Sequence, residues 1–454
     1  MEPRQVKSAS DARKIVKERG LTHVKVGVHD IDGILRGKYI HIDKFHSALE
    51  GGFGFCDVVL GWDSNDQLYD NATYTGWHTG YPDANVRILP DTCREIATEP
   101  GNLMFLCEFV GRAEEICPRG VLRRVLARAE GMGFEVKVGF EYEFFVFAET
   151  AFSIREKGYR NLKPISPGFF GYSVLRNSVL ADWYKDLLAM CETMDMGIEG
   201  LHTETGAGVL EAALRVGDAL PSADRAALFK LFTKVLAQKR DWLATFMAKW
   251  SKDWPGCGGH MHMSLWKDGK SAFHDEKAPH RMSSTMRHFV GGQRALMPET
   301  LAMVAPTVNS YRRLIPGFWA PTDSTWGVEN RTTALRVIPG SAKSTRVEFR
   351  VAAADANPYL ALAAAVGAGL WGIENEVDPG EPIKGNSYDR KHPVKMQLPR
   401  TLMEAAGRLK NSKPAHGLFG DAFVDHYSAT REWEEREFRK AITDWELERY
   451  MEII

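Results

Sequence analysis

The sequence predicts an α+β fold of two domains, a small one over residues 1–110 and a large one over residues 111–454. Three observations support this prediction. The chain, at 454 residues, is longer than a typical single domain. Long stretches with helical periodicity alternate with short strand-like segments in its larger part. A new helical pattern also starts near Cys117–Gly120, which places the domain boundary around residue 110.

Composition and charge exclude several classes of protein. Hydrophobic residues make up 44% and charged residues 26% of the chain, which is typical of a globular protein with a buried core. The 58 Lys and Arg residues against 59 Asp and Glu residues give a net charge of −1. This balance provides neither the basic field that nucleic acid requires nor a polybasic membrane anchor. We therefore expect no nucleic-acid partner and no membrane partner.

The cysteines and the N-terminus predict a cytoplasmic protein. None of the six cysteines forms a C-x-x-C pair of the kind that zinc and redox sites use, so a reducing compartment fits best. The first 20 residues are charged and lack the apolar segment of a signal peptide. The longest apolar run, Leu360–Ile373, is too short to span a bilayer and predicts a buried helix.

The N-terminal elements follow in order. Residues 1–20 predict an amphipathic helix. Thr22–Val28 and Leu35–Ile42 alternate as half-buried strands do, and the turn residues Asp30–Gly33 join them into a hairpin. Gly51–Pro90 is dense in Gly, Asp, Asn, Trp and Tyr with little periodicity, which predicts an ordered functional loop region.

The large domain is predicted to contain long helices and short strands. Helical periodicity covers about 181–196, 222–247, 282–301, 357–375 and 427–450. The strands between them carry most of the ionisable residues considered next. No internal repeat is present.

One predicted strand, Val136–Phe147, places two carboxylates on the same face. Glu141 and Glu143 are two residues apart in a strongly apolar, β-branched and aromatic segment. Unpaired ions there would each cost several kcal/mol, so they must lie at an open rim, pair with Arg or bind a metal. A single such pair is more often an edge-strand surface feature.

The same arrangement recurs in three further segments. Glu204 and Glu211 flank the small residues Thr205–Gly208, which would let the backbone approach a ligand. His260 and His262 share a face of a strand that a Gly-rich segment precedes, and Arg346, Glu348 and Arg350 alternate in the same way. Four strands with ionisable residues on one face indicate a functional site rather than surface decoration.

The residue types narrow the chemistry. Five carboxylates with one or two imidazoles form an oxygen-rich ligand set that suits Mg²⁺ or Mn²⁺ better than Zn²⁺. Arginines suited to phosphate or carboxylate recognition occur nearby, namely Arg313, Arg331, Arg336, Arg346 and Arg350. Together they indicate phosphoryl transfer from a nucleotide. The segment Gly33–Lys38 is not a Walker A motif, and no G-x-G-x-x-G follows a strand.

These segments, in this order, resemble the glutamine synthetase family over nearly the whole chain. The matching motifs are FEYEFF at 140–145, GHMHMSL at 259–265, NSYRRLIPG at 309–317 and RVEFR at 346–350. The resemblance implies a glutamine synthetase-like fold, with a small β-grasp-like N-terminal domain and a large catalytic domain whose curved antiparallel sheet is flanked by helices. It also implies a homo-oligomer, a dodecamer of two stacked hexameric rings in which the N-terminal domain of one subunit completes its neighbour's site.

The resemblance assigns roles to residues of this chain. It implies two to three Mg²⁺ (or Mn²⁺) ions per active site, with Glu143, Glu204 and Glu211 as ligands of one ion and Glu141, His260 and Glu348 as ligands of another. The residues implied to bind glutamate are Gly256, His260, Arg313 and Arg350. Those implied to bind ATP are His262, Ser264, Arg331, Arg336 and Arg346, and Arg331 is also assigned a catalytic role.

The implied reaction has two steps. ATP phosphorylates the γ-carboxylate of glutamate, and an amine nitrogen then attacks the acyl phosphate. Ammonia-using members of the family carry Glu in a Y-E-A-P flap, whereas residues 318–321 of this chain read FWAP. Trp319 would remove an attraction for NH₄⁺ and supply a wall for an alkyl or aryl group. Alternatively, the ring of Trp319 only packs on a neighbouring loop.

The ammonium site of the family is also blurred. Its F-D-G-S-S segment has no clean counterpart in residues 54–62, so Asp57, Asp63 or Asp66 would supply the acid, and Asp57 and Asp63 are predicted to be catalytic. We therefore predict an ATP-dependent carbon–nitrogen ligase that joins glutamate to an organic primary amine (alkyl or aryl) in amine catabolism. The first alternative is a glutamine synthetase that uses ammonia. The second is a non-catalytic binding or structural descendant, which the presence of all six expected metal ligands disfavours.

Overall fold

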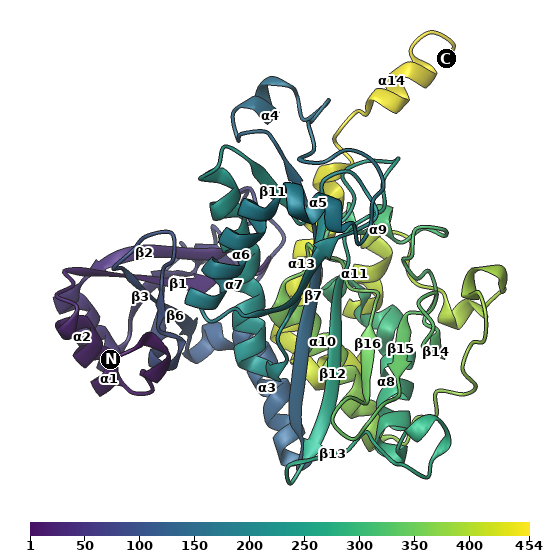
Figure 1. The fold of residues 1–454 in the computed structure, drawn as a ribbon, viewed down its shortest axis with the longest axis horizontal. Helices are drawn as coiled ribbons and strands as arrows, with labels where there is room; N and C mark the ends of the chain where they lie inside the picture. Colours follow the sequence, from purple (N-terminus) through teal and green to yellow (C-terminus); the bar gives the residue numbers. More distant parts are fainter.

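The computed structural model describes residues 1–454 and contains two β-sheets with helices around them (Figure 1). The six-stranded N-terminal sheet has the order β2-β1-β6-β4-β3, with β5 beside β6. The ten-stranded sheet has the order β14-β15-β16-β12-β7-β9-β8, with β10 and β11 on β7 and β13 on β12. All its pairings are antiparallel except β14 with β15. The predicted α+β fold with a large antiparallel sheet is confirmed.

The N-terminal sheet contains the predicted hairpin. Its elements are α1 (Ala9–Glu18), β1 (His23–His29), β2 (Leu35–His41), α2 (Ile42–Gly51), β3 (Phe53–Cys56), β4 (Asp83–Ile88), β5 (Arg94–Glu95) and β6 (Leu103–Phe109). The helix α1 begins after Ser8, whose hydroxyl accepts a hydrogen bond from the amide of Asp11. In the turn between β1 and β2, Gly33 has φ +83°, a conformation that glycine adopts without strain. The expectation of a loop throughout residues 51–90 was wrong, since β3 and β4 lie within this stretch and are too short to show a clear period.

The large sheet is built from short strands around two long ones. Its strands are β7 (Glu135–Phe147), β8 (Ile198–Thr203), β9 (Val209–Leu214), β10 (Gly217–Asp218), β11 (Leu243–Thr245), β12 (Gly259–Lys267), β13 (Lys270–Ser271), β14 (Trp326–Val328), β15 (Leu335–Ile338) and β16 (Arg346–Phe349). The long strands β7 and β12 run side by side through the middle of the molecule (Figure 1).

The helices of the large domain confirm most of the periodic stretches. They are α3 (Pro118–Gly131), α4 (Ser153–Glu156), α5 (Val174–Val179), α6 (Ala181–Thr193), α7 (Ala219–Gln238), α8 (Ser284–Val304), α9 (Ser310–Arg313), α10 (Pro358–Glu374), α11 (Leu402–Lys410), α12 (Lys413–Phe419), α13 (Asp421–Phe438) and α14 (Asp444–Tyr450). No helix is both long enough and apolar enough to cross a membrane.

Two predicted helices end earlier than expected. The helix over 222–247 ends at Gln238, because Asp241 has φ +56° and the chain turns into β11. The helix over 427–450 is two helices, since Thr443 caps α14 with a hydrogen bond from the amide of Glu446. The helix α14 buries none of its residues and projects away from the body of the molecule (Figure 1).

The alanine-rich segment forms α10, the buried helix at the centre of the large domain. It is apolar on all sides because α3, α7 and α8 cover it. Glycines bring α8 and α10 into close contact: a Cβ atom added at Gly292 would lie 2.1 Å from the carbonyl oxygen of Ala368. This tight packing supplies a rigid base behind the large sheet.

The N-terminal domain is packed firmly against the large one. A hydrophobic cluster of its own extends from Val6 to Cys117, but Ile31, Met104 and Leu106 belong to the core of the large domain. Buried ion pairs also cross between the domains, with Arg431 Nη2 2.7 Å from Asp32 Oδ1. The division at residue 110 stays a prediction, and the structure makes the two parts one packed body.

Candidate active site

The register of the large sheet brings the ionisable residues of four strands together. The strand β7 lies between β9 and β12, so that Glu143 faces Glu211 and Glu141 faces His260. On the other side of β12, His262 faces Glu348 of β16. Because neighbouring strands are about 4.8 Å apart, these pairs form one continuous polar face.

A cavity of about 420 Å³ lies over this face. Most of the predicted site residues line it, namely Glu141, Glu143, Glu204, Glu211, Gly256, His260, His262, Arg313, Trp319, Arg331, Arg336, Glu348 and Arg350. Apolar groups complete the wall, including Phe145, Val209 and Phe318. A single cavity therefore combines a carboxylate–histidine cluster, four arginines and an apolar rim.

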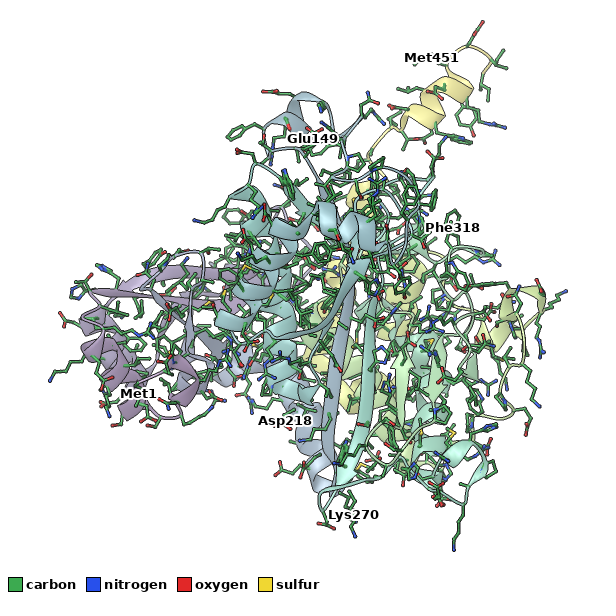
Figure 2. The ribbon with its side chains drawn as sticks, viewed as in Figure 1. Met1, Glu149, Asp218, Lys270, Phe318 and Met451 are labelled. Carbon is green, nitrogen blue, oxygen red and sulfur yellow. The ribbon has the colours of Figure 1, made fainter.

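A second cavity, of about 740 Å³, adjoins the first and shares Glu141 and His262 with it. The predicted ATP residues Ser264 and Arg346 line this second cavity. Its wall also contains Val216 and Trp266. Asp218 of the second cavity and Phe318 of the first lie toward opposite ends of the large sheet (Figure 2). Two ligands could therefore meet at the shared Glu141 and His262.

Three overlapping groups of residues in or beside the first cavity have the ligand types of a metal site. The groups are Glu141 with His262 and Glu348, Glu141 with Glu211 and His260, and His202 with Glu204 and Glu211. In each group the ligand atoms lie within 4.8 Å of one another. The oxygen-rich set fits Mg²⁺ or Mn²⁺. His262 Nδ1 accepts a hydrogen bond from Arg346 at 3.2 Å, and its Nε2 lies 3.5 Å from Glu141 Oε2.

Glu143 is placed differently from the other predicted ligands. Its Oε2 accepts a hydrogen bond from the amide of Gly258 at 2.5 Å, and it belongs to none of the three groups. Its role as a metal ligand stays a prediction. His202 was not predicted, although it lies two residues before Glu204 and so shows the same spacing as Glu141 and Glu143.

The carboxylates differ in their electrostatic environment. Burial disfavours the charge of Glu348, but Arg350 and His260 outweigh this effect and lower the pKa of the carboxyl to about 2. Burial and the nearby charges of Glu141 and Glu143 raise the pKa of Glu211. His202 Nε2 lies 3.0 Å from Glu211 Oε1, and this contact outweighs burial and raises the pKa of His202.

The arginines are held by buried contacts. Arg313 donates to the carbonyl oxygens of Val351 and Arg350 at 3.0 and 3.1 Å. Arg350 pairs with Glu348 Oε1, and its buried Nε has no hydrogen-bond partner. Arg336 Nη1 lies 3.0 Å from Glu348 Oε2. Fixed guanidinium groups of this kind are preorganised to bind a carboxylate or a phosphate.

The flap residue Trp319 lies at the rim of the first cavity. Its side chain is 58% exposed, and its backbone has φ +60°, which is unusual for a bulky residue. Its carbonyl oxygen accepts a hydrogen bond from Arg350 Nη2 at 3.3 Å. Tyr172, another residue that sequence reasoning missed, lines the same cavity and stacks on His202 with 4.3 Å between ring centroids.

The two predicted catalytic aspartates do not reach either cavity within one chain. Asp57 is buried and accepts a hydrogen bond from the hydroxyl of Thr75 at 2.7 Å. Asp63 accepts hydrogen bonds from the amides of Asn65 and Gln67. A catalytic role for either aspartate would need a second copy of the chain to supply it, and this role stays a prediction.

The two cavities adjoin, share Glu141 and His262, and have arginines around these residues. This arrangement is typical of enzymes that transfer a phosphoryl group between two bound substrates. The chain belongs to the glutamine synthetase family, since residues 115–450 match the family described as glutamine synthetase, catalytic domain. The protein is therefore an ATP-dependent ligase that forms carbon–nitrogen bonds.

Its relatives carry different names. The chain is 48% identical to type-1 glutamine synthetase 2 of Dictyostelium discoideum, over 95% of this chain and 84% of that protein. It is 34% identical to a glutamate–isopropylamine ligase of a Pseudomonas species, over 97% of both chains. It is 36% identical to the γ-glutamylethanolamide synthetase GlnA4 of Streptomyces coelicolor, over 93% and 91%. A solved structure of GmaS with ADP matches with a TM-score of 0.85 and 27% identity, over 97% and 99%.

Proposed function

We propose that this protein ligates glutamate to an organic primary amine with an alkyl or aryl group, giving a γ-glutamylamide, ADP and phosphate. The observation that carries the proposal is Trp319. Its exposed indole lies at the rim of the first cavity, where the family resemblance implies a Glu in ammonia-using members. Two relatives named as amine ligases, for isopropylamine and for ethanolamine, support it.

In the first step, Arg313 and Arg350 would hold the carboxylates of glutamate at one side of the first cavity. Nucleotide in the second cavity would direct its terminal phosphate toward Glu141 and His262, which the two cavities share. Bound divalent ions would neutralise the phosphate oxygens. An oxygen of the γ-carboxylate attacks the terminal phosphorus, ADP leaves, and an acyl phosphate forms. Arg331 and Arg336 lie where they could stabilise the transferred phosphoryl group.

In the second step, the neutral amine attacks the carbonyl carbon of the acyl phosphate. The carbon–oxygen bond to phosphate breaks, phosphate leaves, and the nitrogen loses a proton. Trp319 would cover the alkyl or aryl group of the amine and exclude water from the acyl phosphate. The base that takes the proton is proposed to be Asp57 or Asp63 of a neighbouring subunit, in the dodecamer that the family resemblance implies.

The second candidate is a glutamine synthetase that uses ammonia. The observation that favours it is the 48% identity to the Dictyostelium glutamine synthetase, a higher value than either amine ligase gives. The two candidates share the first step and differ only in the nucleophile of the second.

The test measures phosphate release from ATP and Mg²⁺ with glutamate. Ammonia, methylamine, isopropylamine, ethanolamine, putrescine and aniline are compared at equal free-base concentration. We expect an apolar amine to give the highest kcat/KM. A higher kcat/KM for ammonia than for every organic amine would establish the second candidate. No glutamate-dependent phosphate release with any acceptor would instead indicate a non-catalytic descendant.

A further inference from the structure

The flap at the rim of the first cavity, residues 318–321, rests on a buried lysine. Lys249 lies in the segment that joins β11 to β12, and it is only 7% exposed. Its Nζ lies 4.0 Å from the ring centroid of Phe318, which is labelled in Figure 2. Phe318 lines the first cavity and directly precedes Trp319, whereas Lys249 does not line that cavity. Lys249 can therefore act on the reaction only through Phe318.

The backbone of Lys249 is fixed on both sides. Its amide donates a hydrogen bond to Asn309 Oδ1, and its carbonyl oxygen accepts one from Nδ2 of the same side chain, both at 2.8 Å. The carbonyl oxygen of the preceding Ala248 accepts a hydrogen bond from the amide of Cys257 at 2.8 Å. A Cβ atom added at Gly256 would lie 2.4 Å from that same carbonyl oxygen, so the packing here is tight. The lysine side chain therefore extends from a rigid part of the site.

The ammonium group of Lys249 has a carbonyl oxygen and an aromatic ring as its partners. Its Nζ donates a hydrogen bond to the carbonyl oxygen of Trp254. Burial lowers the pKa of Lys249, and the opposing charge of Asp253 does not offset this effect. The negative face of a ring attracts a cation, and the attraction is larger where water is excluded. The ring of Phe318 therefore stabilises the buried ammonium, and the ammonium in turn holds the ring.

The rest of the flap is held through its backbone. The carbonyl oxygen of Trp319 accepts a hydrogen bond from Arg350 Nη2 at 3.3 Å, and that of Ala320 accepts one from the hydroxyl of Tyr388 at 3.1 Å. Both of these contacts lie after Phe318 in the chain. The side chain of Phe318 is apolar, so its place depends on what it packs against. The contact with the ammonium therefore anchors the first residue of the flap.

We propose that Lys249 is a positioning residue that keeps the flap closed over the acyl phosphate. By holding Phe318 it keeps the neighbouring Trp319 at the cavity rim, where the indole excludes water. The proposal rests on the two-step reaction proposed above, but it does not depend on which amine is the nucleophile.

Loss of the contact has a defined chemical consequence. With the flap open, the oxygen of a water molecule attacks the carbonyl carbon of the acyl phosphate in place of the amine. The carbon–oxygen bond to phosphate breaks, phosphate leaves, the water loses a proton, and glutamate forms again. Each such event consumes ATP and releases phosphate without forming an amide. We call this phosphate uncoupled.

The test measures released phosphate and the amide product in the same reaction, on the full chain in its native assembly. Glutamate, ATP and Mg²⁺ are saturating, with either ammonia or isopropylamine as the acceptor. We expect the ratio of uncoupled phosphate to amide to rise at least about fivefold in Lys249→Met, with whichever acceptor the enzyme uses. The KM for ATP, which is proposed to bind in the second cavity, should stay within about twofold of wild type. The control is Lys252→Met, which changes an exposed lysine of the same segment and should leave the ratio unchanged.

Variants of Phe318 test whether the lysine acts through this ring. Phe318→Leu removes the ring without changing a buried charge and should raise the ratio of uncoupled phosphate to amide about as much as Lys249→Met. The double variant should raise it no further, because both changes remove the same contact. Phe318→Tyr keeps a ring over Nζ and should raise the ratio less than Phe318→Leu.

Three results would overturn the proposal. They are an unchanged ratio in Lys249→Met, a double variant whose effect equals the product of the single effects, and equal uncoupling by Phe318→Tyr and Phe318→Leu. A general loss of stability lowers both products together and leaves the ratio unchanged, so it counts against the proposal. If Lys249→Met does not fold, Lys249→Gln, which keeps a donor for the Trp254 carbonyl without the charge, takes its place.

The outcome for Lys249 is separate from the outcome for the amine. A preference of the wild-type enzyme for ammonia would refute the proposed acceptor, and the ratio in Lys249→Met with ammonia would still decide the role of the lysine. No glutamate-dependent phosphate release by wild type would overturn both proposals.

Discussion

Replacement of Trp319 by Ala tests how the enzyme selects its amine. The indole is 58% exposed, so one ring face is free to cover a ligand at the cavity rim. Complete burial of the three carbons of isopropylamine would contribute about 2.4 kcal/mol, at about 0.8 kcal/mol per carbon. Because Trp319 supplies one wall only, we take about half of this value. Trp319→Ala should then lower kcat/KM for isopropylamine about five- to tenfold.

Ammonia provides the internal control because it has no carbon to bury. The kcat/KM for ammonia in Trp319→Ala should stay within about twofold of wild type. The ratio of kcat/KM for isopropylamine to kcat/KM for ammonia therefore measures the contact between Trp319 and the alkyl group. Trp445→Ala is the matched variant, since Trp445 is also 58% exposed but lies on α14. Steady-state phosphate release, after subtraction of the rate without amine, measures all three proteins. An unchanged isopropylamine-to-ammonia ratio in Trp319→Ala would refute the assignment of Trp319 to the amine site.

Three further predictions concern charge. Glu348→Ala leaves Arg336 and Arg350 without their shared carboxylate. We therefore expect phosphate release to fall more than about 100-fold and the free energy of unfolding, measured by urea melts, to fall by about 3 kcal/mol. An unchanged free energy of unfolding would contradict the buried ion pairs. Burial lowers the pKa of His426 from 6.5 to about 4, so the unfolded state takes up a proton first and about 3 kcal/mol of stability is lost as the pH falls from 6.5 to 4. His426→Gln, which retains a donor for the Leu60 carbonyl, should remove that part of the slope in urea melts at several pH values, and an unaltered slope would argue against it. Chelation of divalent ions should abolish phosphate release and lower Tm, because the clustered carboxylates then repel one another, whereas added Mg²⁺ or Mn²⁺ should restore both.

Local sequence patterns predicted those parts of the fold that local physics determines. The hairpin of β1 and β2 followed from alternation and turn residues, and the buried helix α10 from its unbroken apolar run. The ends of α7 and α13 were missed because periodicity continues past them. A positive φ at Asp241 and a new cap at Thr443 end the helical path there, and both depend on single residues.

The site residues were predicted only in part, because local patterns do not show which strands and loops are neighbours. Alternation along one strand shows that Glu141 and Glu143 share a face, but only the register between strands shows that Glu141 faces His260. Tyr172 was missed because it lies in a segment without a period and reaches the site by stacking on His202. Asp57 and Asp63 show the limit of a single chain, since a neighbouring subunit would have to bring them to the cavity.

Identity over the whole chain and choice of amine depend on different residues. The carboxylates, histidines and arginines of the two cavities serve the phosphoryl step, which ammonia-using and amine-using enzymes have in common, so strong overall similarity is expected in either case. In the proposed mechanism, the second step distinguishes ammonia from a larger amine where the nucleophile enters, and we propose that this is the rim formed by Phe318 and Trp319. An exchange of a carboxylate for an indole there removes a charge that attracts ammonium and adds apolar surface, and both effects favour an amine with a carbon chain. The 48% identity to a glutamine synthetase is therefore compatible with either nucleophile, and the isopropylamine-to-ammonia ratio in wild type and Trp319→Ala decides between them.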